Sequence, residues 1–309
     1  MSFSLDVQSI DMKRTIPILL LHILLALSAC GGTDSAEDID DQTNQGSVSA
    51  ATAEPATAYQ TGVHLQGVYE LPDWLRGLEP IESEMNYLLY LPDDYGQDPE
   101  RQWPLIVFLH GSGDDDFDSA WVMSSGLPEV LFNDDQPDNF DFVVVSPQSF
   151  FSTTWWDRVT PVVVNILVDE IISTYQLDPA RVYITGLSMG GYGAWYVAAA
   201  DHDKYAAMVS ISGSGYRTTT IPGEEVMCQI EDVPLWAIHG SLDQISNPDA
   251  NRIYVEAYED MCDGEVNITF YPDEGHFGAY FKAYRDPALY DWFLSKTKQN
   301  GSTPSDDPG

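Results

Sequence analysis

The feature that most constrains the fold is a tight turn centred on Ser188. The β-branched and aromatic run at residues 182–185 stops at Gly186, and a small-residue run compatible with a helix begins at Met189. Gly186 and Gly190 stand two residues from Ser188 on either side, the Gly-x-Ser-x-Gly pattern of a nucleophile elbow. Such a turn strains the serine backbone, and the glycines remove the clashes that larger neighbours would make. The pattern predicts a serine hydroxyl exposed at the end of a buried strand.

Strand-like and helix-like runs alternate along most of the chain. Runs typical of strands occupy residues 85–91, 105–109, 142–145, 182–185, 207–211, 235–238 and 268–271. Runs with helical spacing or a proline start occupy residues 161–175, 192–200, 248–261 and 287–294. Repeated βα units predict one α/β domain, at residues 63–297, with a mostly parallel sheet covered by helices on both faces.

An elbow serine needs a base, and the base needs an acid that orients it. Asp243 follows the strand-like run at 235–238, and His276 follows the one at 268–271. Loops at the carboxyl ends of parallel strands meet at one edge of the sheet, so we expect both side chains near Ser188. The competing residues have ordinary structural explanations. Asp249 suits a helix start, and His202 and His239 suit a solvated helix end and a satisfied strand end.

Further candidates surround this predicted triad. Residues 110–113 read His-Gly-Ser-Gly directly after a buried strand, so an N–H group of Gly111 or Ser112 could join that of Met189 in an oxyanion hole. His110, Trp155 and Trp156 are candidates for lining a substrate pocket, although the two tryptophans could equally cap the core beneath a loop. His110 has no other histidine or cysteine at metal-ligand spacing, so we expect no metal and no cofactor.

Four blocks of sequence carry a resemblance to a known family. They are residues 90–92, 104–113, 178–191 and the two loops that hold Asp243 and His276. In these blocks the chain resembles α/β-hydrolase serine esterases, the group that includes feruloyl esterases, polyhydroxybutyrate depolymerase-like enzymes and predicted peptidases. The resemblance implies an α/β-hydrolase fold and hydrolysis of carboxylic esters through an acyl-enzyme. The substrate would be a small ester or one linked to a plant polysaccharide. Peptidase activity from the same triad, or a surface binding protein with a retired active site, are the alternatives.

The first residues have the features of an export signal. Lys13 and Arg14 precede an apolar run at 16–27, and Leu-Ser-Ala-Cys then ends at Cys30. This resembles a bacterial lipobox, which implies a signal peptide at residues 1–29 and a lipid anchor on Cys30. Gly31 in the next position favours the outer membrane over the inner. Polar residues at 30–62 predict a disordered tether, and residues 298–309 predict a disordered tail.

Charge and cysteine content narrow the partners and the compartment. The 309-residue chain has 49 acidic and 13 basic side chains, a net charge of −36, which disfavours nucleic acid and anionic membranes as partners. The membrane contact that remains is the lipid anchor. If Cys30 carries lipid, Cys228 and Cys262 are left, and in an oxidising compartment they are expected to pair unless packing keeps them as two separate buried thiols.

Overall fold

The computed structural model describes residues 59–75, 82–113, 122–150, 154–216 and 220–298. The predicted signal peptide, Cys30 and almost all of the predicted tether and tail lie outside these ranges. One described residue of the expected tether and one of the expected tail contact the domain. The ring of Tyr59 packs edge-on against Tyr95, and the N–H of Lys298 donates to the carbonyl of Ala180. Within the described residues, no helix combines the length and the apolarity needed to cross a membrane.

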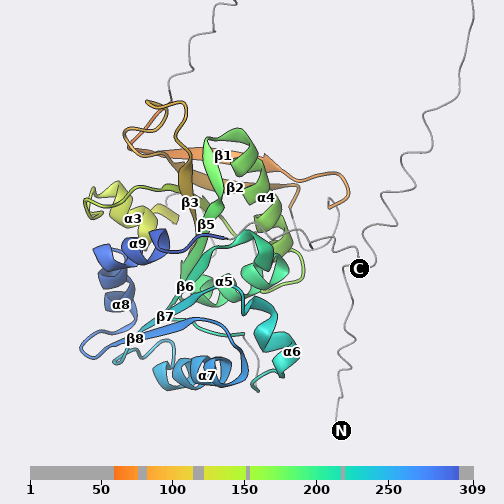
Figure 1. Cartoon of the computed structure of the whole chain (residues 1–309), viewed down its shortest axis with the longest axis vertical. Coiled ribbons are helices and arrows are strands. Elements are labelled where there is room, and N and C mark those ends of the chain that lie inside the picture. The colour runs from red at the N-terminus through yellow and green to blue at the C-terminus, as the bar shows by residue number, and fades with distance from the viewer. Residues whose placement is uncertain (1–58, 76–81, 114–121, 151–153, 217–219, 299–309) are drawn as a thin grey trace, which may run out of the picture. The chain divides into compact units, whose positions relative to one another are not determined.

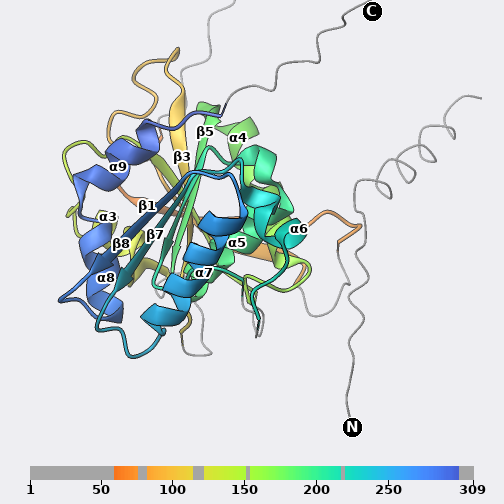
Figure 2. The same cartoon turned by 60° about the horizontal axis from the view of Figure 1, so that its bottom comes forward.

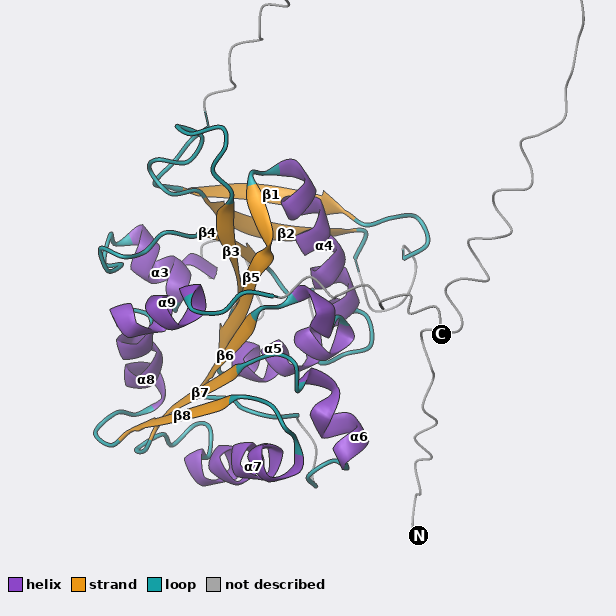
Figure 3. Cartoon of the chain, viewed as in Figure 1, coloured by secondary structure: helices purple, strands orange, loops and turns teal. Residues whose placement is uncertain are grey.

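The described strands form one sheet of eight strands, in the order β1-β2-β4-β3-β5-β6-β7-β8 (Figure 3). Strands β1 and β2 are antiparallel to their neighbours, and β3 to β8 run parallel to one another. The strands are β1 (His64–Glu70), β2 (Glu84–Tyr90), β3 (Trp103–Leu109), β4 (Val143–Pro147), β5 (Leu177–Leu187), β6 (Ala207–Ile211), β7 (Leu235–Gly240) and β8 (Val266–Tyr271). The mostly parallel sheet predicted from the alternating runs is confirmed.

Helices cover both faces of this sheet, as Figures 1 and 2 show. One face carries α4 (Thr160–Thr174), α5 (Met189–Ala200) and α7 (Pro248–Met261), and the other carries α3 (Leu127–Phe132), α8 (His276–Ala283) and α9 (Pro287–Leu294). The short helix α6 (Glu224–Met227) and the 3₁₀ turns η2 (His202–Lys204) and η3 (Cys228–Ile230) lie in the connections.

Alternation along the central strands divides the core into two layers. In β3, Leu105, Val107 and Leu109 face the α4–α5–α7 layer, while Ile106 and Phe108 face the α3–α8–α9 layer. All five are fully buried, because a strand covered by helices on both sides exposes neither face. The unbroken apolar run at 105–109 follows from this position. The two helix layers hold the sheet between them. Polar side chains are therefore accommodated in the loops beyond the carboxyl ends of the strands.

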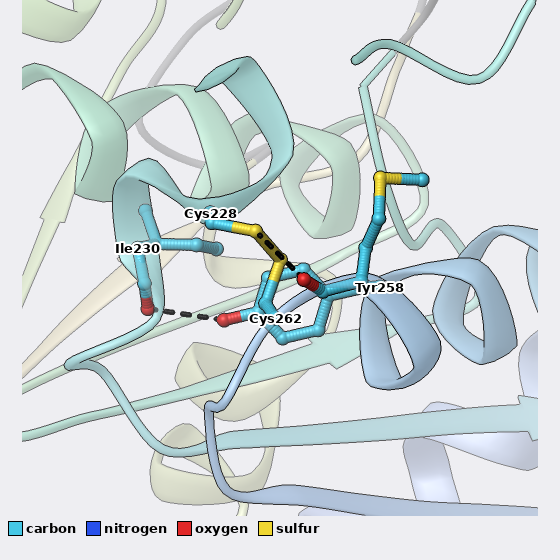
Figure 4. Close-up of a disulfide and its surroundings, with 5 residues drawn as sticks. Cys228, Ile230, Tyr258 and Cys262 are labelled. Carbon is cyan, nitrogen blue, oxygen red and sulfur yellow. Dashed lines mark hydrogen bonds between the residues drawn. A yellow bond between two sulfur atoms is a disulfide. The ribbon is translucent and has the colours of Figure 1, made fainter. Parts of the chain in front are cut away.

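A disulfide closes the segment that contains β7 and α7. Cys228, in η3, is bonded to Cys262, just after α7, with their Cα atoms 5.3 Å apart (Figure 4). Beside the bridge, the Tyr258 hydroxyl donates to the carbonyl of Ile230 at 3.2 Å, also seen in Figure 4. The predicted pairing is confirmed, and the alternative of two separate thiols is wrong.

Candidate active site

The loops that follow the parallel strands all open at one edge of the sheet. Gly111 follows β3, Ser188 follows β5, Asp243 follows β7 and His276 follows β8. Because parallel strands end at the same edge, residues far apart in the sequence are brought to one place by the topology alone.

Ser188 has the strained backbone that the glycine pattern predicts. Its φ and ψ are 53° and −113°, and it stands immediately before the first residue of α5. A side chain at Gly186 would clash with the carbonyl of Gly190, and one at Gly190 would clash with the carbonyl of Leu109. The turn is therefore closed so tightly that only glycine fits on either side. Ser188 is left half-buried at the N-terminus of a helix.

The loop after β3 lies directly against this turn. A Cβ on Gly111 would come within 2.6 Å of Leu187 Cδ1 and 3.6 Å of Ser188 Cβ. On the other side, Met189 is the first residue of α5, so its N–H has no acceptor within the helix and lies at the positive end of the helix dipole. Gly111 and Met189 thus flank the serine. Ser112, the other candidate donor from the β3 loop, is exposed.

Asp243 and His276 form a buried pair. His276 Nδ1 is 2.6 Å from Asp243 Oδ2, and the Asp243 side chain is completely buried. The other carboxylate oxygen accepts the N–H groups of Ile245 at 2.8 Å and Ser246 at 2.9 Å. A carboxylate held in this way leaves the imidazole no freedom to turn, and it requires a proton on Nδ1, which leaves Nε2 free to accept one.

The hydrogen bonds also keep Asp243 charged. Burial by itself raises the pKa of the Asp243 carboxyl. The bonds from His276, Ser246 and Ile245 outweigh that effect and hold its pKa below the usual value. Asp243 is therefore an acceptor at neutral pH and not a proton donor.

The carboxyl end of β6 and the residue after it connect Ser188 with His276. The Ser188 N–H donates to the carbonyl of Ile211 at 2.8 Å, and the hydroxyl of Ser212 donates to the carbonyl of His276 at 3.4 Å. Ser212 is itself buried with a positive φ of 54°. Two consecutive residues thus fix the backbones of Ser188 and His276 against one strand end. The sequence showed no signal for this role of Ser212.

His110 and Trp155 do not line an open pocket, which corrects the expectation for His110 and, for Trp155, favours the alternative of a side chain that caps the core. Each is fully buried. His110 Nε2 accepts the N–H of Ser149 at 3.1 Å, its Nδ1–H donates to the Gly111 carbonyl at 2.7 Å, and the Trp155 indole N–H donates to the His110 carbonyl at 2.9 Å. Together they clamp the β3 loop, and burial lowers the pKa of His110 to about 4, so that it stays neutral.

Trp156 lies elsewhere, half-buried against the rings of Tyr192 and Tyr196 on α5. Three apolar residues close in sequence to Asp243 and His276 are each more than half exposed: Leu242, Ile245 and Phe277. The Phe277 ring stands edge-on to the imidazole of His276, with centroids 5.6 Å apart. The described part of the site therefore has an exposed aromatic ring beside His276 and two exposed apolar residues close to Asp243 in the sequence.

The competing residues lie apart from the buried pair, with one exception. Asp249 is exposed in the first turn of α7, which Asn247 caps, and His202 is in η2 beside Asp203. His239 is the exception, because its Nε2 is 2.9 Å from Asp243 Oδ2. The sequence signal for this contact was the position of His239, at the end of a strand and four residues before Asp243. Across the described ranges, no three His, Cys, Asp or Glu side chains gather so as to hold a metal ion.

Comparison with known proteins assigns the chain to a family. Residues 79–267, more than half of the chain, match the family described as "Putative esterase". The chain is 26% identical over 195 residues to the bifunctional acetylxylan esterase/xylanase XynS20E of Neocallimastix patriciarum, covering 61% of this chain and 26% of that protein. It is 25% identical over 142 residues to acetylxylan esterase A of Emericella nidulans, covering 42% and 43%.

The chain thus spans less than half of the length of these two relatives. Among solved structures, the crystal structure of a thermostable esterase is similar with a TM-score of 0.57 and 25% identity, over 76% of this chain and 63% of that one. This likeness and the mostly parallel sheet confirm the α/β-hydrolase fold. The match over residues 79–267 shows that the chain belongs to the esterase family.

Proposed function

We propose that the protein is a serine carboxylester hydrolase whose triad is Ser188, His276 and Asp243. The observation that carries the proposal is the buried Asp243–His276 pair in the loops after β7 and β8. These loops open at the sheet edge where strained Ser188 immediately precedes α5. Membership of the esterase family supports the reaction class.

In the proposed reaction, Ser188 Oγ attacks the ester carbonyl while His276 Nε2 takes its proton. Asp243 accepts the Nδ1–H and stabilises the imidazolium that forms. The N–H of Met189, with that of Gly111 or Ser112, would bind the oxyanion. His276 then gives its proton to the departing alcohol. The acyl-enzyme is cleaved by a water molecule that His276 deprotonates, which releases the acid and restores Ser188.

For the substrate, we propose an acyl ester carried on a polysaccharide or on another alcohol. The two relatives named as acetylxylan esterases support this class. The exposed apolar side chains of Leu242, Ile245 and Phe277 would contact the apolar part of such an ester beside the base. Trp156 is a further candidate for this surface, because it is half-buried against the start of α5.

The test is hydrolysis by the purified chain of p-nitrophenyl acetate, acetylated xylan, methyl ferulate and a peptide p-nitroanilide. We expect turnover of the esters that falls by several orders of magnitude in Ser188→Ala. Ser241→Ala, which changes an exposed serine at the same sheet edge, is the matched control and should retain activity. Cleavage of the peptide alone would identify a peptidase. No turnover of any substrate by the folded wild-type chain would favour a binding protein.

We also propose that the mature protein is anchored to the outer membrane of a bacterial cell envelope by lipid on Cys30. The support is the sequence of residues 13–30, which lies outside the described structure. Expression in a bacterial host should yield a membrane-associated chain beginning at a lipidated Cys30, and Cys30→Ala should yield precursor or soluble protein. Mass spectrometry that finds an unmodified Cys30 in the mature chain would reject the anchor.

A further inference from the structure

His239 contacts the same carboxylate oxygen as the predicted catalytic base. Asp243 Oδ2 lies 2.6 Å from His276 Nδ1 and 2.9 Å from His239 Nε2. With the N–H groups of Ile245 and Ser246 on Oδ1, the carboxylate has four nitrogen neighbours. The reaction proposed above uses only one of the two histidines, so the second requires an explanation.

The contacts of His239 fix its tautomer. Its Nε2 lies between two acceptors, Asp243 Oδ2 at 2.9 Å and the carbonyl oxygen of Ser246 at 3.2 Å. Only a protonated Nε2 satisfies both. Its Nδ1 is buried without a hydrogen-bond partner among the described residues, and a second proton placed there would be a buried unpaired donor. The geometry therefore requires a neutral ring that donates from Nε2.

The surroundings of the ring favour the neutral form. Phe270 of β8 stacks on the imidazole of His239. The guanidinium of Arg252 of α7 lies over the Phe270 ring, 4.0 Å from its centroid. Burial lowers the pKa of His239 more than the facing Asp243 carboxylate raises it, and His276 of α8 adds a further lowering effect. His239 and His276 therefore meet one carboxylate in different roles.

We propose that His239 is a positioning residue whose Nε2–H holds the Asp243 carboxylate in the orientation that His276 needs. The inference rests on the proposed function, since it assigns a role within that triad. Two N–H groups from different elements, the end of β7 and the start of α8, fix Oδ2 from two directions. The His239 bond also withdraws charge from Oδ2, which moderates the attraction between Asp243 and a protonated His276.

The test compares His239→Phe, which keeps a ring of similar size without a donor, with His239→Gln, which keeps an amide N–H. In His239→Phe we expect kcat/KM for p-nitrophenyl acetate to fall about tenfold, the effect of one hydrogen bond to a charged group. We also expect the acid limb of its pH profile to move to higher pH, because a less shared carboxylate holds the His276 proton more strongly. His239→Gln should restore most of the rate and the original limb.

The matched control is His202→Gln, a partly exposed histidine away from the site, which should keep the wild-type rate and profile. A His239→Phe variant that folds and keeps the wild-type profile would overturn the proposal, as would a His239→Gln variant that restores nothing. If Ser188→Ala retained full activity, the triad itself would be wrong, and this result distinguishes failure of the proposed function from failure of the inference.

A second measurement observes the tautomer in the wild-type chain itself. ¹⁵N-edited NMR of histidine side chains in the full wild-type chain at neutral pH should show the His239 ring as a neutral Nε2–H tautomer. Assignment to His239 follows from loss of that signal in His239→Gln. An Nδ1–H tautomer of His239, or a His239 ring that carries both protons at neutral pH, would overturn the proposal.

Discussion

The backbone of Ser188 adopts a conformation that few residues with a side chain reach. A φ of 53° with a ψ of −113° costs on the order of 1–3 kcal/mol in a non-glycine residue, so the surrounding packing must enforce it. The contact of Ser188 N–H with the Ile211 carbonyl is part of that enforcement. The sequence indicates this strain through Gly186 and Gly190, since both positions of the turn leave no room for a side chain.

This strain predicts different stabilities for two variants that both lack the Ser188 hydroxyl. Ser188→Gly should be more stable than Ser188→Ala by about 1 kcal/mol, because glycine adopts the positive φ freely whereas alanine retains the Cβ. Chemical denaturation of the two purified variants measures the difference. A Ser188→Gly variant no more stable than Ser188→Ala would mean that the turn is not strained.

The choice of acid is tested at the same scale. Asp243→Asn should reduce kcat by roughly 10⁴, the effect of the same change in a serine protease triad, because an amide disfavours the required imidazole tautomer. Asp249→Asn changes an exposed carboxylate of α7 and is the matched control, expected to retain activity. Greater damage from Asp249→Asn in ester assays would show that Asp243 is not the acid.

His110, which anchors the loop after β3, makes the stability of the folded protein depend on pH. Its pKa is lowered to about 4 in the folded protein, against 6.5 for an ordinary histidine. Between these values the unfolded chain binds one more proton, so the contribution of His110 is present above about pH 6.5 and is lost as the pH falls towards about 4. The loss amounts to about 3 kcal/mol in the free energy of unfolding.

His110→Asn removes this titration, so the variant should be less stable than the wild type at neutral pH but should lose less stability on acidification. Denaturant unfolding at several pH values between about 4 and 7 measures both slopes. Equal slopes in the two proteins would show that His110 is not held neutral by burial.

At the scale of elements, the disulfide is the clearest case of a device that supports the site. Cys228 and Cys262 are 34 residues apart and enclose β7, Asp243 and α7. For a closed loop of this length, chain entropy contributes about 3–4 kcal/mol to stability. The bridge therefore limits the conformational freedom of the segment around Asp243 in the unfolded chain.

Cys228→Ala/Cys262→Ala should lower the free energy of unfolding by about that amount while the folded variant keeps its kcat at 25 °C. Adding reductant to the wild type should reproduce the loss, and reductant should leave the variant unchanged. If the double variant and the wild type unfold at the same denaturant concentration, packing alone holds the segment.

Elements that depend on local pattern could be predicted from the sequence, and those that depend on distant partners could not. The strand Ala207–Ile211 and the helices Pro248–Met261 and Pro287–Leu294 have the predicted bounds. Strand β1 was missed because it is a half-buried edge strand with Gly67 at its centre. That glycine is explained only by the ring of Tyr87, which occupies the space a side chain would need. Helix α8 was missed because glycines surround its first residue, His276.

At the scale of the whole molecule, the sheet topology determines which residues meet. The sequence placed Ser188, Asp243 and His276 after three strands, and the parallel order of those strands brings their loops to one edge. The burial of Trp155 could not be predicted, because it depends on Gly193 of α5 leaving room for the indole. The sharing of Asp243 between two histidines likewise depends on side-chain geometry that spacing does not give.

The central claim is that Ser188 is the nucleophile of an ester hydrolase, and covalent labelling tests it most directly. A fluorophosphonate reacts with a serine that is activated by a neighbouring base. After treatment of the full chain, peptide mass spectrometry should find one adduct, on Ser188, and ester hydrolysis should fall in proportion to the labelled fraction. An adduct on another residue, or ester hydrolysis that persists when Ser188 is fully labelled, would contradict the claim.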